Sequence, residues 1–289
     1  MMNLIDISSW QRGLNLSVLF DQNNLNGIIV KTSGGVSHKQ DTCEAWLDWL
    51  IDNNKPFGFY HFLDDDLRHS SGKDEADFWF NNYRKYFGKG MPFADYEGVA
   101  KNHGVKYLKE FLDRIKELSN IKCGVYCSLS VINEQDFRDV ANAGYPLWVA
   151  QYANYNVVNG FRDNPWQSGS VLPFKDYVMH QYTSMGYLNG WNGRLDFDLF
   201  KGTAQDWYDM IGNESIDRRE VNPEIVNMVL RNELGTGNIR KQKLEELGYN
   251  YNEVQNKINE LYGIALSCKR YTNGNDEYLN SICYIIRNL

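Results

Sequence analysis

The chain has 289 residues, of which 37 are acidic and 30 are basic, so its formal net charge is −7. Hydrophobic residues make up 43 % of the chain, which excludes a protein that is disordered over most of its length. The acidic excess argues against a general nucleic-acid binder, because such a protein needs a basic face to displace counterions from phosphates. No run of about 18 uncharged apolar residues occurs, so no membrane span is predicted.

The amino-terminal residues Met-Met-Asn-Leu-Ile-Asp have neither a basic start nor an apolar core. We therefore expect no secretory signal and synthesis in a cytoplasm. The five cysteines are an odd number in a long chain and are expected to be reduced thiols. The close pair Cys123 and Cys127 does not predict a zinc site, because tetrahedral zinc needs four ligands, or three and a water.

The chain divides by composition near residue 215. All eight tryptophans precede residue 208, and residues 217–289 hold 10 acidic and 10 basic residues, so the whole charge of −7 belongs to residues 1–216. Residues 212–222 are almost entirely polar. We predict a first domain over residues 1–213, a linker over 214–222 and a second domain over 223–289.

The first domain alternates short apolar runs with segments of helical period. Ser71 and Asp74 have the spacing of a helix cap and its partner, and apolar residues from Val105 to Leu118 recur at helical spacing, which indicates a core-facing helix. The runs bounded by Gly, Pro, Asn or Asp predict eight buried strands, over residues 4–7, 27–32, 57–62, 92–97, 122–127, 147–151, 177–181 and 195–199.

This alternation predicts an α/β fold with a parallel sheet, and eight strands in about 200 residues predict a closed barrel. After Cys127 the helices become short, and a long loop over residues 153–176 precedes the seventh strand. We therefore expect an irregular, TIM-like barrel with a last third rich in β-structure. Active groups of such barrels gather at the carboxyl ends of the strands.

Carboxylates occur at the ends of several predicted strands: Asp6, Asp95 with Glu97, and Asp196 with Asp198. Side chains two apart on a strand point to the same side, so Asp95 and Glu97 are expected to face one space. Two carboxylates held close together cannot both ionise cheaply, which yields a protonated acid beside an ionised partner, as glycosidic cleavage requires. Aromatic rings on which sugars can stack lie nearby in sequence: Trp10, Tyr60, Tyr126, Trp148, Tyr152 and Trp191.

These residues resemble the ordered motifs of glycoside hydrolase family 25, the lysozymes of phages and some bacteria. The matching segments are Asp6-Ile-Ser-Ser-Trp-Gln11, Gly58-Phe-Tyr-His-Phe62, Asp95-Tyr-Glu97, Leu147-Trp-Val-Ala-Gln-Tyr152, His180-Gln-Tyr182 and Leu195-Asp-Phe-Asp198. The resemblance implies five β/α units followed by three more strands. It also implies N-acetylmuramidase activity, the cleavage of the β-1,4 bond from N-acetylmuramic acid to N-acetylglucosamine in peptidoglycan.

The resemblance implies a role for each acidic group. Glu97 would be the general acid, and Asp95 would stabilise the charge developing at C1 and the neighbouring acetamido group. Asp6 and Asp196 would orient the sugar and tune this pair. The sequence leaves open whether the nucleophile is a protein group or the acetamido oxygen of the substrate, and the spacing of the pair favours substrate assistance. The implied substrate-binding residues are Tyr60, Tyr126, Trp148, Gln151 and Asp198.

Two positions depart from the family pattern. Asp198 stands where the family more often has a neutral amide, and Gly34 stands where it frequently has an acidic residue. The second change is expected to affect the rim of the cleft. A rival site, His61 to His69 with three aspartates between them, has the composition of a metal cluster but lies in one predicted loop, so we expect a solvated acidic loop and no metal or other cofactor.

Residues 223–289 predict three short helices, over 223–232, 238–247 and 252–262, and a further amphipathic helix over 263–289 that packs on them or mediates oligomerisation. This all-α domain resembles a three-helix cell-wall-binding repeat of phage lysozymes, with Leu234 where that repeat usually has an aromatic residue. The residues implied in wall binding are Arg240, Tyr249 and Tyr251, and Arg240, Lys241 and Lys243 form a basic group that would favour an anionic wall.

The sequence thus predicts a two-domain peptidoglycan hydrolase, most simply a phage endolysin held in the host cytoplasm until release and then acting on the bacterial cell wall. Its predicted partner is peptidoglycan, with neither nucleic acid nor membrane. A chitinase-like β-N-acetylhexosaminide hydrolase and a lectin-like wall binder with a catalytically silent barrel are the alternatives.

Overall fold

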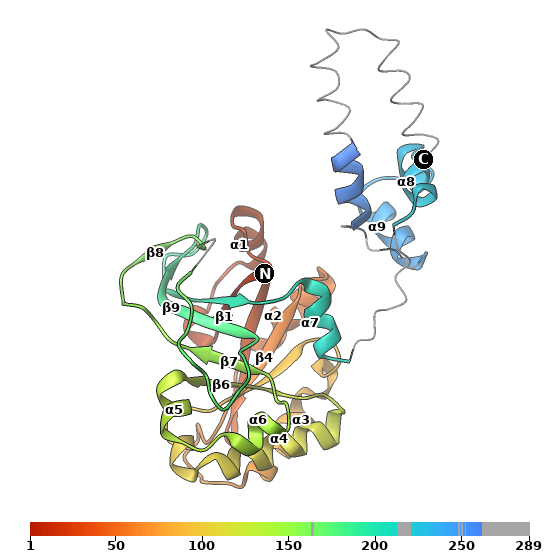
Figure 1. Cartoon of the computed structure of the whole chain (residues 1–289). Helices are drawn as coiled ribbons and strands as arrows, with labels where there is room; N and C mark the ends of the chain where they lie inside the picture. Colours follow the sequence, from red (N-terminus) through yellow and green to blue (C-terminus); the bar gives the residue numbers. More distant parts are fainter. Residues whose placement is uncertain (163–164, 213–220, 248, 250, 252, 262–289) are drawn as a thin grey trace. The chain divides into compact units, whose positions relative to one another are not determined.

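The computed structural model describes residues 1–162, 165–212, 221–247, 249, 251 and 253–261. The chain forms two compact units, Met1–Asn213 and Glu214–Leu289 (Figure 1). The apolar clusters of the first unit share no residue with that of the second. Among the described residues no helix is both long enough and apolar enough to span a bilayer.

The described part of the first unit contains a closed barrel. The strands follow each other around it in the order β1-β10-β9-β7-β6-β5-β4-β2, and pairing of β1 with β2 closes it. Two short strands, β3 (His38–Lys39) and β8 (Val158–Asn159), pair at its margin with β2 and β9. The barrel strands are β1 (Met2–Ile7), β2 (Gly27–Gly34), β4 (Phe57–Phe62), β5 (Met91–Asp95), β6 (Gly124–Ser128), β7 (Leu147–Ala150), β9 (Met179–Tyr187) and β10 (Leu195–Phe200). The eight predicted strands are therefore confirmed.

Of these barrel strands in the described part of the chain, β10 alone runs antiparallel to both of its neighbours, β1 and β9. A connection of seven residues, 188–194, joins β9 to β10, and such a short link can join only antiparallel strands. The other strands pair in parallel, with helices after β1, β2, β4, β5 and β6. The expected five β/α units followed by three strands are confirmed.

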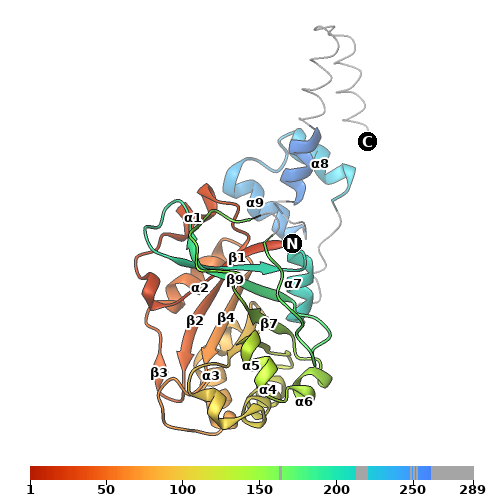
Figure 2. The ribbon, with the colours of Figure 1, turned by 60° about the vertical axis from the view of Figure 1, so that its left-hand side comes forward.

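Helices surround the barrel, and Figure 2 shows α3 beside α4. The predicted cap is present, because the side chain of Ser71 accepts a hydrogen bond from the backbone N–H of Asp74. The predicted apolar stripe is buried along α4. The α-helices are α1 (Leu16–Gln22), α2 (Cys43–Asp52), α3 (Gly72–Tyr83), α4 (Val105–Ser119), α5 (Leu129–Glu134), α6 (Arg138–Asn142) and α7 (Ala204–Met210), and the 3-10 helices are η1 (Ser9–Gln11), η2 (Arg84–Tyr86) and η3 (Ala100–His103).

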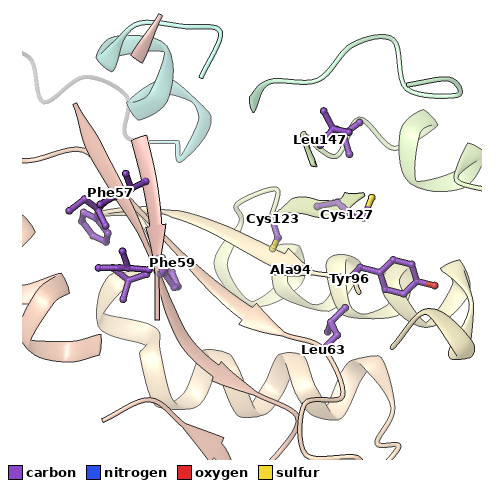
Figure 3. Close-up of a cluster of buried hydrophobic side chains, with 14 of the residues drawn as sticks. Phe57, Phe59, Leu63, Ala94, Tyr96, Cys123, Cys127 and Leu147 are labelled. Carbon is purple, nitrogen blue, oxygen red and sulfur yellow. The ribbon is translucent and has the colours of Figure 1, made fainter. Parts of the chain in front are cut away.

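Two apolar clusters build this unit. One lies between the strands and the helices, and Figure 3 shows the part around Phe59, Ala94 and the buried thiols of Cys123 and Cys127. The other fills the barrel, where the indole N–H of Trp207 on α7 donates to the carbonyl of Phe57 at 3.1 Å. Alternate strand residues point inward, and they change from apolar near the amino ends of the parallel strands to polar near their carboxyl ends. The polar end is the mouth of the barrel.

The second unit contains α8 (Pro223–Leu230) and α9 (Gly237–Glu246), and residues 253–261 are also helical. Ile225, Val229, Leu244 and Val254 belong to its buried cluster. Leu234 is buried in the same cluster, so the residue that replaces the aromatic side chain serves the core. The helix predicted over residues 263–289 lies outside the described residues.

Candidate active site

The mouth of the barrel brings together the carboxylates that the sequence singles out. Asp6 on β1 lies opposite Asp196 on β10, because the antiparallel strand begins where β1 ends. Asp95 is the last residue of β5, and it lies close enough to Asp6 and Glu97 for both to raise its pKa. Asp6 and Asp95 are buried, whereas Asp196 and Glu97 are half-buried and accessible from the mouth.

Glu97 does not lie on a strand, contrary to the prediction of a strand over residues 92–97. β5 ends at Asp95, and Glu97 follows in the connection to η3. Burial raises the pKa of Glu97, while the ammonium groups of Lys31 and Lys101 oppose that shift. Burial also raises the pKa of Asp95 well above its usual range, followed by the charge of Glu97. The pair therefore favours one bound proton, and Glu97 is its more accessible member.

The other carboxylates also resist ionisation. Burial and then the charge of Glu97 raise the pKa of Asp196 to about 6. Burial and the neighbouring charges of Asp6 and Asp196 raise the pKa of Asp198 well above its usual range. Asp198 is fully buried and accepts a hydrogen bond from the indole N–H of Trp148 at 2.8 Å. Asp198 therefore lies beneath the mouth, where it fixes the indole of Trp148.

A glutamine that was not among the predicted site residues connects the mouth. Gln181 on β9 is buried, and its amide N–H donates to Asp6 at 2.6 Å. Its carbonyl oxygen accepts hydrogen bonds from the hydroxyls of Tyr126, at 2.9 Å, and Tyr152. The register places Gln181 beside Asp198 on β10. The motif His180-Gln-Tyr182 contained this residue, but only the strand pairing reveals its role.

The predicted aromatic residues separate into two groups. Tyr126 is half-buried at the mouth. Tyr60 is 9 % exposed, and burial, followed by the charge of Asp6, raises its pKa well above its usual range. Trp148 is only 1 % exposed and packs edge-on against Phe93 inside the barrel, beneath the predicted sugar groove. Trp10 lies at the other extreme, because it is 90 % exposed on η1, directly after β1.

Gln151 also acts from behind the mouth. Its side-chain oxygen accepts hydrogen bonds from the backbone N–H of Gly169, at 2.8 Å, and from the hydroxyl of Ser168. These contacts fix the long connection between β7 and β9.

The connection between β4 and α3 differs from the expected solvated loop. The side chain of Asp64 is fully buried, and Asp65 forms an ion pair with Lys31 at 3.0 Å. A Cβ atom on Gly34 would lie 2.3 Å from Cβ of Asp65, so Gly34 leaves the space that Asp65 occupies. The missing acidic residue at position 34 is thus replaced in space by a carboxylate from the next strand connection.

In the second unit, the residues predicted to bind the wall also hold the helices together. The guanidinium of Arg240 donates to the carbonyl of Gly235 at 2.8 Å. The hydroxyl of Tyr249 accepts a hydrogen bond from Asn222, and Tyr251 packs half-buried against the apolar cluster. The lysine side chains near Arg240 include Lys243, which donates to the carbonyl of Glu233, and Lys241, which lies outside the described side chains.

Comparison with known proteins agrees with this architecture. The model of the family described as glycosyl hydrolases family 25 matches residues 5–191, and the model of the CW_7 repeat matches residues 223–262. No curated protein matches the chain at a significant level.

Solved structures share the barrel. A bacterial lysozyme from Streptomyces coelicolor is 21 % identical, with a TM-score of 0.60 over 73 % of this chain and 97 % of that one. The catalytic domain of endolysin ply40 from bacteriophage P40 of Listeria monocytogenes is 25 % identical, with a TM-score of 0.57 over 73 % and 98 %. A muramidase from Acremonium alcalophilum is 17 % identical, with a TM-score of 0.57 over 74 % and 100 %. With the family model matching more than half of its length, the chain belongs to glycosyl hydrolases family 25 and is a glycoside hydrolase.

Proposed function

We propose that the first unit is an N-acetylmuramidase that hydrolyses the β-1,4 bond from N-acetylmuramic acid to N-acetylglucosamine in peptidoglycan. The observation that carries this proposal is the half-buried Glu97, with its raised pKa, beside the more deeply buried Asp95 in the mouth of the barrel. A carboxyl group with a raised pKa holds its proton to higher pH than a free one does, and it can give that proton to the leaving oxygen of a glycosidic bond. Similarity to a lysozyme, a muramidase and an endolysin supports the choice of substrate.

In the reaction that we favour, the acetamido oxygen of the substrate bonds to C1 as the bond from C1 to the leaving oxygen breaks. Glu97 gives its proton to that oxygen. Water then attacks C1 and gives a proton back to Glu97, and the oxazolinium ring opens. The carboxylate of Asp95 accepts the acetamido N–H and balances the positive charge. Asp6 and Asp196 orient the sugar, and Tyr60 and Tyr126 contact it.

A protein nucleophile is the rival route, in which Asp95 itself bonds to C1. The two routes differ in what accumulates on the enzyme. Intact-protein mass spectrometry during turnover of a slow substrate is expected to show the mass of the free enzyme, and a glycosyl adduct on Asp95 would favour the rival route.

The test of the function is mass spectrometry of the fragments that the protein releases from peptidoglycan, beside Glu97→Gln and the exposed control Glu134→Gln. We expect reducing ends on N-acetylmuramic acid from the wild type and from the control, and about 10²–10⁴-fold less release from Glu97→Gln. Reducing ends on N-acetylglucosamine would indicate a different bond, as for a chitinase-like enzyme. Equal and negligible release from all proteins would indicate a lectin-like binder.

We also propose that residues 1–213 are the catalytic domain and that residues 223–289 hold the enzyme on the wall. The CW_7 match supports this division, with Arg240, Tyr249 and Tyr251 as wall-binding residues. Binding of the whole chain and of an Arg240→Gln variant to purified wall sacculi tests it.

The likeness to the catalytic domain of a phage endolysin supports a place in host lysis, with the protein held in the host cytoplasm until the membrane is permeabilised. The test of this part compares host cells that express the protein with and without a membrane pore, and cells to which the purified protein is added from outside. Lysis of the expressing cells is expected only with the pore.

A further inference from the structure

Two histidines and an aspartate meet on the mouth side of the barrel, outside the group of carboxylates that forms the candidate active site. Asp64 and His69 lie in the connection between β4 and α3, and His103 is the last residue of η3, which follows β5. Nδ1 of His69 and Nε2 of His103 each lie 2.8 Å from Oδ2 of Asp64. One ligand atom of each residue thus lies within 4.8 Å of the other two.

The carboxylate at the centre of this trio is fixed by its surroundings. The side chain of Asp64 is fully buried, and its second oxygen, Oδ1, accepts the backbone N–H of His69 at 2.9 Å. The backbone N–H of Asp64 donates to Glu75, which in turn bonds to the buried His61. These contacts leave Oδ2 facing the two imidazoles, and supporting bonds of this kind orient the ligands of protein-bound metals.

The imidazoles, by contrast, reach solvent. The side chain of His69 is 58 % exposed and that of His103 is 26 % exposed, with ring centroids 5.2 Å apart. An ion held by the three residues would therefore keep a coordination position open to water. The ring of His103 also packs against Tyr107 at 4.9 Å, so the more movable of the two imidazoles is that of His69.

We propose that Asp64, His69 and His103 form a zinc site with water as the fourth ligand. Two imidazoles and a carboxylate suit zinc, whereas magnesium and calcium prefer oxygen ligands alone. Ligand atoms of a tetrahedral zinc ion are about 3.3 Å apart, so each imidazole has to retreat from Asp64 by about 0.5 Å.

The ion would join two connections of the mouth. His103 follows Glu97 by six residues, and Asp65, the neighbour of Asp64, pairs with Lys31, whose charge acts on Asp95 and Glu97. Zinc would thus clamp the β4–α3 connection to the segment that carries Glu97. The expected effect is stabilisation of the mouth, and it does not depend on which glycosidic bond the enzyme cleaves.

The test titrates zinc into the chelator-treated full chain and follows thermal unfolding and bound metal. At a tenfold excess of zinc over its Kd, the midpoint of unfolding is expected to rise by about 3–6 °C with one ion bound. The variants His69→Gln and His103→Gln are expected to weaken binding by more than about 100-fold. The matched control is His38→Gln, which removes a half-exposed imidazole outside the trio and should behave as the wild type.

X-ray absorption at the zinc edge identifies the ligands, and nitrogen and oxygen neighbours without sulfur are expected. Sulfur neighbours would place the ion at cysteines and overturn the assignment. Equal affinity of the wild type and the double variant His69→Gln, His103→Gln would overturn it, as would absence of binding up to about 100 µM zinc. Because His69 is exposed, its variant is expected to fold, which circular dichroism checks.

Discussion

Asp6 on β1 and Asp198 on β10 are diagonal neighbours on one face of two paired strands, because Asp198 pairs with Leu4 and Asp196 pairs with Asp6. Burial, and then the charges of Asp6 and Asp196, raise the pKa of Asp198 well above its usual range. The raised pKa favours the neutral, protonated form of Asp198. A neutral carboxyl group offers one donor and one acceptor, as an amide does, which accounts for an aspartate where the family more often has a neutral amide.

Replacement of Asp198 by Asn should consequently preserve activity to within a few-fold. The raised pKa means that the neutral acid is present at low pH and is lost as the pH rises, whereas an amide stays neutral. The variant is expected to keep its activity to higher pH than the wild type in a pH–rate profile. Asp198→Leu removes the acceptor of the Trp148 indole N–H and serves as the contrast, with a large loss at every pH. Equal alkaline limbs for the wild type and Asp198→Asn would refute the neutral, protonated form of Asp198.

Replacement of Asp95 by Asn should stabilise the fold while it abolishes most of the activity. A carboxyl group with a raised folded-state pKa destabilises the protein as the pH rises above its unfolded-state pKa, and the amide removes that cost. We expect the unfolding midpoint at pH 7 to rise by about 2–4 °C, measured by calorimetry, with a smaller difference at pH 4. Exposed Asp139→Asn is the control, and a lower midpoint for Asp95→Asn contradicts the expectation.

The pH dependence of activity should respond to Asp196. Burial, and then the charge of Glu97, raise the pKa of Asp196 to about 6, and by reciprocity an ionised Asp196 helps Glu97 to keep its proton. Asp196→Asn is therefore expected to move the alkaline limb of kcat/KM toward lower pH. The wild type, Asp196→Asn and Asp139→Asn are compared in one buffer series, and an unchanged limb would show that the two groups titrate independently.

Gly34 should be intolerant of a side chain for a local reason. A Cβ atom there lies 2.3 Å from Cβ of Asp65, so Gly34→Ala has to displace the β4–α3 connection. We expect a loss of about 1–3 kcal/mol in the free energy of unfolding, measured by denaturant titration. The double variant Gly34→Ala, Asp65→Gly removes the clash. Adding Gly34→Ala to Asp65→Gly is therefore expected to cost less free energy of unfolding than adding it to the wild type. Additive losses would place the strain elsewhere.

The sequence predicted the barrel because each strand is a short apolar run with clear boundaries, and it predicted the carboxylates because strand ends meet at one mouth. Asp6 and Asp95 could be placed at the mouth from their positions at strand ends alone. The role of Gln181 could not be predicted in this way, because it arises from the pairing of β9 with β10 and from two tyrosines on other segments. The burial of Trp148 could not be predicted either, because an inward-facing and a groove-facing tryptophan have the same local sequence pattern.

The cluster at Asp64 shows the same limit. Within residues 61–69 the spacing of His and Asp indicated a loop with no third imidazole, because His103 is 39 positions away from Asp64 in the chain. Parallel strands β4 and β5 bring their following connections to the same end of the barrel, and that juxtaposition supplies the missing imidazole. Residues that are distant in sequence, such as His103, can be assigned to such a cluster only once the strand topology is known.

The antiparallel course of β10 also determines where the ends of the barrel lie. Met2 pairs with Phe200, so the first strand begins and the last strand ends side by side at the end opposite the mouth. In a circular permutation of this unit, a short flexible linker could join the chain after α7 to the start of β1. Such a linker would lie at the end of the barrel opposite the mouth. New termini opened in the connection between α2 and β4, at residues 53–56, would likewise leave Asp6, Asp95 and Glu97 in place.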